Sequence, residues 1–217
     1  MERGIIDVYD RSIFEMRNVF TAEECQAFID YHKKNPNTTN GQVIELGTGK
    51  RIINHKVKKT TDVGLDPYNK LINIFIEGVQ KVFINYMKHL DVINREECGL
   101  RLFARSEIQA PNIQRVDKGG YFNWHTDYTE DPNEQRILAI IVYLNDIDEE
   151  NGGSTEFNSG RKVQPEAGKV LIFPTSDLHL HRGNTIIDGN SKYIMTNFLT
   201  RPNDPVPKQN DFPFIFH

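Results

Sequence analysis

The segment GGYFNWHTDYTEDPNEQRILAIIVYLND (residues 119–146) decides the fold, because two strand-like runs flank a polar break. The runs YFNWHTDY (121–128) and RILAIIVYLN (136–145) are rich in aromatic and β-branched residues, as strands are. His125 and Asp127 stand two positions apart in the first run, so on a strand their side chains share one face. Both are costly to bury without a partner. The pattern predicts a strand that presents an imidazole and a carboxylate to a common partner.

From about Gly99 onward, the chain reads as a series of short strands. The other runs of this kind are LRLFARSEIQAPNIQRV (100–116), GGSTEFN (152–158), GKVLIFP (168–174) and SKYIMTNFLT (191–200). Gly, Pro, Asn or Asp separates them, and no helical period lies between one and the next. This pattern disfavours a parallel sheet with crossover helices and predicts a sandwich, a barrel or a jelly roll.

Two helices are predicted in the N-terminal part of the chain. Thr21 and Glu24 have the spacing of a capping box, and an apolar stripe then predicts a helix over residues 22–33. A second helix is predicted to start with Asp66 as N-cap and Pro67 at its first position. Its apolar stripe indicates core packing and consists of Ile72, Phe75, Val79, Val82, Phe83, Tyr86 and Met87. No catalytic motif is found before about residue 90, so this part is expected to support the core.

Composition narrows the class of protein. The chain has 217 residues, 38% hydrophobic and 26% charged, which suits one domain with a real core. A formal charge of −4 argues against sequence-independent nucleic-acid binding, and HKVKK (55–59) is interpreted as a solvated edge. Cys25 and Cys98 form no CxxC pair, and neither a signal peptide nor a 20-residue apolar span is visible. We therefore expect a soluble, cytoplasmic protein that binds neither nucleic acid nor a membrane.

The imidazole and carboxylate of the HTD triplet need a third ligand to hold a metal. His179 and His181 are the only histidines in the later strand region, and both remain candidates on this reasoning. Two His and one carboxylate form the facial triad of non-haem Fe(II) oxygenases. Zinc would also accept these ligands, and a hydrogen-bonded His–Asp pair at the surface is the non-metal alternative.

Five segments, taken together and in order, resemble the prolyl 4-hydroxylase-like group of Fe(II)/2-oxoglutarate-dependent dioxygenases. They are DKGGYFNWHTD (117–127), IIVYLND (140–146), NGGSTEF (151–157), VQPEAGKVLIFPT (163–175) and HRGNTIIDGNSKYIMTNF (181–198). The resemblance covers residues 114–201. It implies a mostly β protein with flanking helices (α+β), built on a double-stranded β-helix core of the jelly-roll, cupin-like type. The expected organisation is a single domain over 1–217, with a helical support region to about 95, the core over about 96–201 and a tail over 202–217.

The resemblance also implies site residues. His125, Asp127 and His181 match the iron ligands, with His179 as the alternative to His181. Lys192 matches the basic residue that pairs with the distal carboxylate of 2-oxoglutarate.

Two further residues match the lining of the co-substrate pocket, and two depart from the family pattern. Tyr143 matches a pocket-lining tyrosine, for which core packing is the alternative, and Thr196 matches a hydroxyl beside it. Val116 and Phe122 stand where the family usually has tyrosines. These departures put the affinity for 2-oxoglutarate in question but not the class of reaction.

The implied function is hydroxylation coupled to decarboxylation of 2-oxoglutarate to succinate and CO2. The implied cofactors are Fe(II), 2-oxoglutarate and O2, with ascorbate (vitamin C) as a candidate addition. A prolyl side chain in a peptide or protein is the favoured substrate, held in a groove lined by Tyr128, Trp124 or Arg136. Another residue, or a small molecule, is the alternative within the same chemistry.

Other functions fit the residues less well. A metal-binding β-barrel without turnover has no need of all four of His125, Asp127, His181 and Lys192. A halogenase would lack the carboxylate at Asp127, and a zinc hydrolase has no use for Lys192. The sequence does not indicate an oligomeric state.

Overall fold

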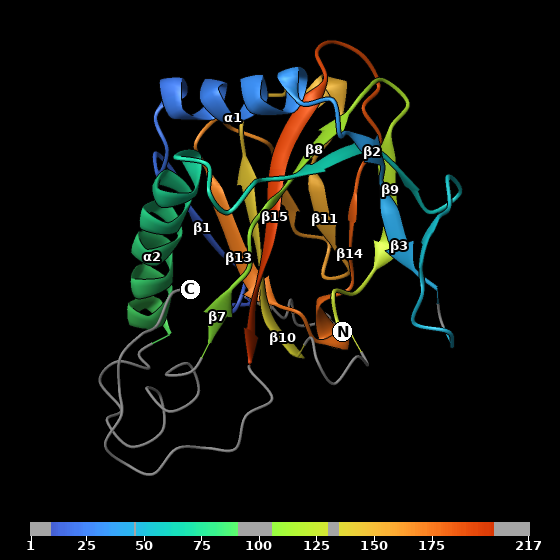
Figure 1. Cartoon of the computed structure of the whole chain (residues 1–217). Helices are drawn as coiled ribbons and strands as arrows, with labels where there is room; N and C mark the ends of the chain where they lie inside the picture. The colour runs from blue at the N-terminus through green and yellow to red at the C-terminus, as the bar shows by residue number, and fades with distance from the viewer. Residues whose placement is uncertain (1–9, 46, 91–105, 130–134, 202–217) are drawn as a thin grey trace, which may run out of the picture.

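A computed structural model of the chain describes residues 10–45, 47–90, 106–129 and 135–201. Two antiparallel sheets face each other, and two helices cover the outer side of the larger sheet (Figure 1). The predicted jelly-roll core with flanking helices is confirmed. The predicted tail (202–217) and the start of the first late run (100–105) lie outside the described residues.

The strands pair out of sequence order, as a jelly roll requires. The larger sheet runs β1 (Phe14–Met16), β13 (Val170–Pro174), β10 (Gln135–Tyr143), β15 (Lys192–Arg201), β8 (Asn112–Val116), β6 (Thr61–Gly64) and β2 (Thr39–Asn40), with β7 (Glu107–Ile108) also paired to β15. The smaller sheet runs β12 (Lys162–Val163), β11 (Thr155–Phe157), β14 (His181–Gly183), β9 (Tyr121–His125) and β5 (Lys58–Lys59). A separate hairpin joins β3 (Gln42–Ile44) to β4 (Arg51–Ile53), and two 3-10 turns cover Glu149–Asn151 and Asp177–His179.

The N-terminal part is less purely helical than the sequence predicted. It adds β1, β2 and β6 to the larger sheet and β5 to the smaller one. These strands have two to four residues each, too few for an alternating pattern to be recognised. Both sheets therefore depend on residues far upstream of the core segment.

The first helix, α1 (Ala22–Lys34), begins where the sequence predicted. The Thr21 hydroxyl accepts the N–H of Glu24, and the Glu24 carboxylate accepts the N–H of Thr21, which completes the capping box. Cys25 is buried on the inner face of this helix, where burial raises the pKa of its thiol to about 11.

The second helix, α2 (Leu71–His89), begins later than predicted. The carboxylate of Asp66 accepts the N–H of Tyr68, and the side-chain oxygen of Asn69 accepts the N–H of Leu71. The carboxylate that was expected to cap a helix at Pro67 thus stabilises a local turn, and Asn69 stabilises a second turn before the helix begins. The predicted apolar stripe does pack in the core. Neither helix of the described residues combines the length and apolarity needed to cross a membrane.

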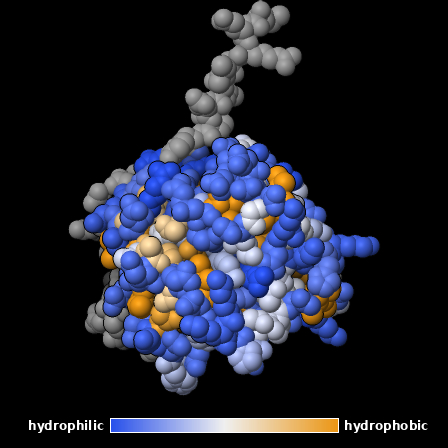
Figure 2. All heavy atoms as spheres, turned by 90° about the horizontal axis from the view of Figure 1, so that it is seen from above, coloured by the Kyte–Doolittle hydropathy of each residue, from blue (hydrophilic) through white to orange (hydrophobic). Residues whose placement is uncertain are grey.

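Strand β15 separates the core from a cavity between the two sheets. Its residues Tyr193, Met195 and Leu199 pack against the two helices. The alternate residues, beginning with Lys192 and Ile194, line the cavity on the other face. Seen from above, the surface is mostly hydrophilic, with apolar side chains in separate patches (Figure 2).

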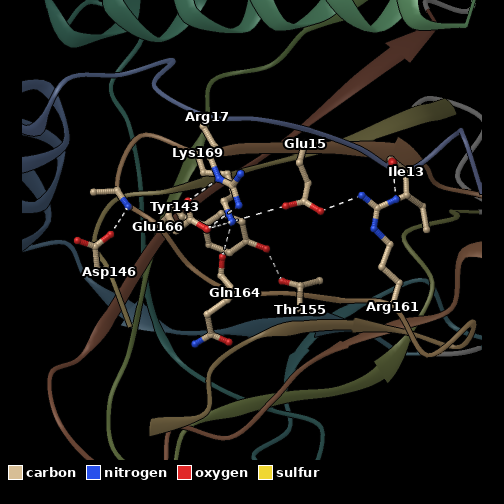
Figure 3. Close-up of polar contacts among 11 residues, drawn as sticks. Ile13, Glu15, Arg17, Tyr143, Asp146, Thr155, Arg161, Gln164, Glu166 and Lys169 are labelled. Atoms are coloured by element: carbon tan, nitrogen blue, oxygen red, sulfur yellow. Dashed lines mark hydrogen bonds and ion pairs between the residues drawn. The ribbon is translucent and has the colours of Figure 1, made fainter. Parts of the chain in front are cut away.

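A network of ion pairs holds the edge strand β1 to the core. The Lys169 side chain is 2% exposed, and its ammonium lies 3.5 Å from a Glu15 oxygen and 2.5 Å from a Glu166 oxygen (Figure 3). Arg17 and Arg161 pair with the same two carboxylates. Buried charges are tolerated here because each one has a partner.

Candidate active site

A β-bulge in β9 shapes the site. His125 pairs with His181 of β14, whereas Phe122 pairs with Gly183, so three residue steps on β9 match two on β14. In a regular strand, residues 122 and 125 would face opposite sides of the sheet. The extra residue returns both to one side, where their rings stack at 3.5 Å with an 11° interplanar angle. The sequence alone gave no sign of this bulge.

The bulge also orients His125. The carbonyl oxygen of Asn123 accepts a hydrogen bond from Nδ1 of His125 at 2.7 Å, which leaves Nε2 as the free nitrogen. Burial, with a smaller effect from His181 nearby, lowers the pKa of His125 to about 4. The imidazole is therefore neutral at physiological pH, as a metal ligand must be.

Asp127 lies beyond the end of β9, so the strand expected over residues 121–128 is shorter than predicted. Its carboxylate nevertheless reaches the same space, with Oδ1 at 3.8 Å from Nε2 of His125 and Oδ2 at 3.5 Å from Nε2 of His181. His181 opens β14 and donates from Nδ1 to the carbonyl of His179 at 2.9 Å. One ligand atom from each of the three residues lies within 4.8 Å of the others, in the manner of a facial triad.

His179 lies outside this group. It belongs to the 3-10 turn rather than to the strand of His181, so the two do not share a strand face as expected. Its Nε2 lies 2.7 Å from the Ser12 hydroxyl and 3.3 Å from Asp10, and its Nδ1 lies 2.9 Å from the Ser176 hydroxyl. Both ring nitrogens are thus engaged away from Asp127.

A cavity of about 1570 Å³ opens in front of the triad, between the two sheets and the β3–β4 hairpin. Its wall includes Trp124, Tyr128 and Arg136, the three residues expected to line a substrate groove. Such a volume exceeds the range of roughly 300–1,000 Å³ typical of small-ligand pockets. The cavity has room for a small molecule and part of a second one.

Lys192 lines the same cavity and is 3% exposed. Its ammonium donates to the carbonyl of Gly153 at 2.8 Å, and burial lowers its pKa to about 8. No carboxylate of the described residues pairs with it. A Cβ added to Gly183 would lie 3.8 Å from this ammonium and 3.7 Å from Phe122, so there is room for a methyl group beside the ammonium. A buried ammonium beside open space suits an anionic ligand.

The two predicted lining residues differ in their placement. Thr196 lines the cavity and accepts a hydrogen bond from the Gln114 side chain at 2.9 Å. Tyr143 is not among the residues that line it, and its placement matches the alternative of core packing. It is fully buried among apolar side chains, and its hydroxyl donates to Thr155 at 2.7 Å, as Figure 3 shows. Thr155 is the cavity-lining member of that pair, and the sequence reasoning missed it.

The two departures from the family pattern also lie on the cavity wall. Val116 pairs with Lys192 across β8 and β15, and Phe122 lies close to Gly183. The wall next to the ammonium is therefore apolar at two positions. Thr155 and Thr196 are among the cavity-lining residues that carry a hydroxyl.

Comparison with known proteins agrees with this geometry. Residues 111–200 match the model of the 2OG-Fe(II) oxygenase superfamily. The chain is 27% identical to a PKHD-type hydroxylase of Synechococcus sp. (strain CC9902) over 70 residues, 31% of this chain and 32% of the relative. It is 25% identical to the probable prolyl 4-hydroxylase 9 of Arabidopsis thaliana over 210 residues, 84% of this chain and 66% of the relative. Each match thus spans less than two thirds of the relative's length.

A solved structure shows the same fold. The prolyl hydroxylase of Trichoplax adhaerens, in complex with a hypoxia inducible factor oxygen degradation domain peptide fragment, superposes with a TM-score of 0.67 at 12% identity. The superposition covers 88% of this chain and 84% of that one. The segment matched by the family model, residues 111–200, contains His125, Asp127 and His181. These comparisons support a 2OG-Fe(II) oxygenase domain over residues 111–200, in a chain that resembles prolyl 4-hydroxylases.

Proposed function

We propose that this protein is an Fe(II)- and 2-oxoglutarate-dependent dioxygenase that hydroxylates a prolyl residue of a peptide or protein. One observation carries the proposal: the His125–Asp127–His181 group and the buried ammonium of Lys192 line one cavity. The first suits a divalent metal and the second suits a carboxylate. A single dicarboxylic co-substrate could use both.

His125 and His181 would hold Fe(II) through Nε2, and Asp127 through its carboxylate. The carbonyls of Asn123 and His179 fix the two imidazoles by accepting from Nδ1, so the ligand nitrogens are set before metal binds. When bound, Fe(II) and 2-oxoglutarate supply the oxidising chemistry, in which O2 delivers one oxygen atom to the substrate and one to succinate as CO2 leaves.

Lys192 would bind the distal carboxylate of 2-oxoglutarate, with the Thr196 hydroxyl beside it. Within the described part of the chain the ammonium has one hydrogen-bond partner, the Gly153 carbonyl, so two of its hydrogens remain to reach a carboxylate. Val116 and Phe122 would exclude water from this contact and so strengthen it. This apolar wall offsets part of what the missing tyrosine hydroxyls would contribute.

A peptidyl substrate is supported by the size of the cavity and by the nature of its rim. The volume of about 1570 Å³ accommodates a co-substrate together with a segment of another chain. Trp124 and Tyr128 are exposed at the rim, where their flat rings suit contact with a proline ring. The structurally similar Trichoplax adhaerens enzyme binds a peptide fragment.

The setting of the protein forms part of the proposal. A buried thiol at Cys25 suits a reducing, cytoplasmic compartment. Ascorbate is a candidate reductant for keeping the iron ferrous. We also retain the single-domain organisation over residues 1–217 as a proposal.

Anaerobic titration tests the site directly. Addition of Fe(II) and 2-oxoglutarate together should produce the visible charge-transfer absorption of a ferrous 2-oxo acid chelate, and neither should produce it alone. Asp127→Ala should abolish the band while leaving the circular dichroism spectrum unchanged. A full band in Asp127→Ala, or none in the wild type, would overturn the proposed site.

A further inference from the structure

The wall of the same cavity contains a group of polar side chains that the proposed function leaves without a role. Lys58 in β5 and Asp62 in β6 are 4% and 7% exposed, and their side chains form an ion pair at 2.7 Å. Asn112 also donates to the Asp62 carboxylate, at 3.2 Å, and the Thr60 hydroxyl donates to its other oxygen. The pair is therefore fixed by several bonds rather than free to move.

The ion pair joins the two sheets next to the site. Lys58 lies on the edge strand of the smaller sheet and Asp62 on a strand of the larger one. Lys58 is also the backbone partner of Phe122 on β9. Its position relative to that ring is thus set both by the strand ladder and by the ion pair.

Phe122 connects this pair to the proposed metal ligand. The Lys58 ammonium lies over the Phe122 ring, 5.3 Å from its centroid, and the same ring stacks on His125 at 3.5 Å. A cation over an aromatic face is attracted by the negative charge of that face, which stabilises this arrangement. The His181 ring lies 4.2 Å from His125, so the His125 imidazole has ring neighbours that limit its rotation.

We propose that Lys58, Asp62 and Phe122 form a positioning group that holds the His125 ring in the orientation needed to bind the metal. The proposal rests on the proposed function, because it takes His125 as a ligand. It gives Phe122 a role that needs the ring but not a hydroxyl. Residues that orient a metal-binding histidine commonly change metal affinity about 10- to 100-fold when removed.

Binding of Co(II) to the metal-free protein is the test, because it needs neither O2 nor turnover. Phe122→Leu should raise the Kd for Co(II) about tenfold and alter the visible Co(II) absorption spectrum. Phe122→Tyr keeps the ring and should bind Co(II) as the wild type does. Equal affinity and spectrum in Phe122→Leu, or an equal loss in Phe122→Tyr, would overturn the proposal.

A second variant tests the ion pair without leaving a charge unpaired. Lys58→Ala/Asp62→Asn removes both charges and the lysine stem, and it should weaken Co(II) binding severalfold, in the same sense as Phe122→Leu. Lys59→Met, on the same strand but exposed, is the matched control and should have no effect. A double variant that folds and binds Co(II) normally would exclude the pair from the group. Failure of the wild type to bind Co(II) would instead overturn the proposed function and this inference with it.

Discussion

Replacement of Lys192 by Met should raise the stability of the ligand-free protein and lower its affinity for 2-oxoglutarate. Burial lowers the pKa of Lys192 from 10.5 to about 8, so the folded protein holds this proton less tightly than the unfolded chain does. At neutral pH that difference corresponds to about 3 kcal/mol against folding. Losing the hydrogen bond to the Gly153 carbonyl costs about 1 kcal/mol. Lys192→Met should therefore stabilise the ligand-free protein by about 2 kcal/mol.

The same change should weaken 2-oxoglutarate binding. A charge-assisted hydrogen bond contributes about 1.5–3 kcal/mol, which corresponds to an increase in Kd of roughly 10- to 150-fold. Calorimetry under anaerobic conditions, with Mn(II) in place of Fe(II), measures this Kd without turnover. The affinity for Mn(II) itself should not change.

Urea unfolding at several pH values checks the stability part. Because the unfolded chain binds more protons between pH 8 and 10.5, the free energy of unfolding of the wild type should rise across that range relative to Lys192→Met. The advantage of the variant should thus shrink as the pH is raised. Lys118→Met, at an exposed lysine, is the control and should change neither quantity. A variant that is several kcal/mol less stable yet binds 2-oxoglutarate normally would refute the reasoning, since Lys192 would then be structural.

Three further predictions concern single side chains. His181→Ala should abolish Co(II) binding measured by calorimetry, whereas His179→Ala should retain it, because only the first faces Asp127; the reverse result would exchange their roles. Thr155→Val should lower the free energy of unfolding by about 1–3 kcal/mol, because it leaves the buried Tyr143 hydroxyl without its acceptor; adding Tyr143→Phe should recover part of that loss in the same urea assay. Lys169→Met should lower the free energy of unfolding in urea by only about 1 kcal/mol, because Arg17 and Arg161 still pair with the two carboxylates after the buried ammonium is lost; a loss of several kcal/mol would show that the buried ammonium is essential to the network.

Much of the core could be predicted from the sequence, because its strands carry clear local signals. The runs around β10, β13 and β15 are apolar and bounded by turn residues, and the capping box at Thr21 marks the start of α1. The i, i+2 spacing of His125 and Asp127 indicated a shared site even though β9 ends at His125. In these cases the residue types and their spacing within one segment were sufficient to predict the element or the site.

The rest depends on contacts between distant segments. The stacking of Phe122 on His125 requires a bulge, which is visible only in the pairing of β9 with β14. Tyr143 could not be assigned to core or cavity from its strand position, because both faces of β10 are buried at that end. Lys58 pairs with Asp62 on a strand of the other sheet, but nothing in the basic run 55–59 distinguishes Lys58 from its exposed neighbours. Such placements are decided by tertiary packing rather than by propensity.

In the proposed function, this protein couples 2-oxoglutarate decarboxylation to hydroxylation of a prolyl side chain. The most direct measurement reconstitutes the protein with Fe(II) without oxygen, adds O2, and follows succinate with and without a panel of proline-containing peptides checked by mass. We predict that one or more peptides stimulate succinate formation and gain one oxygen atom at proline, in a one-to-one ratio with succinate. Succinate formation that no peptide stimulates would contradict the prolyl substrate, and no succinate at all would contradict the dioxygenase itself.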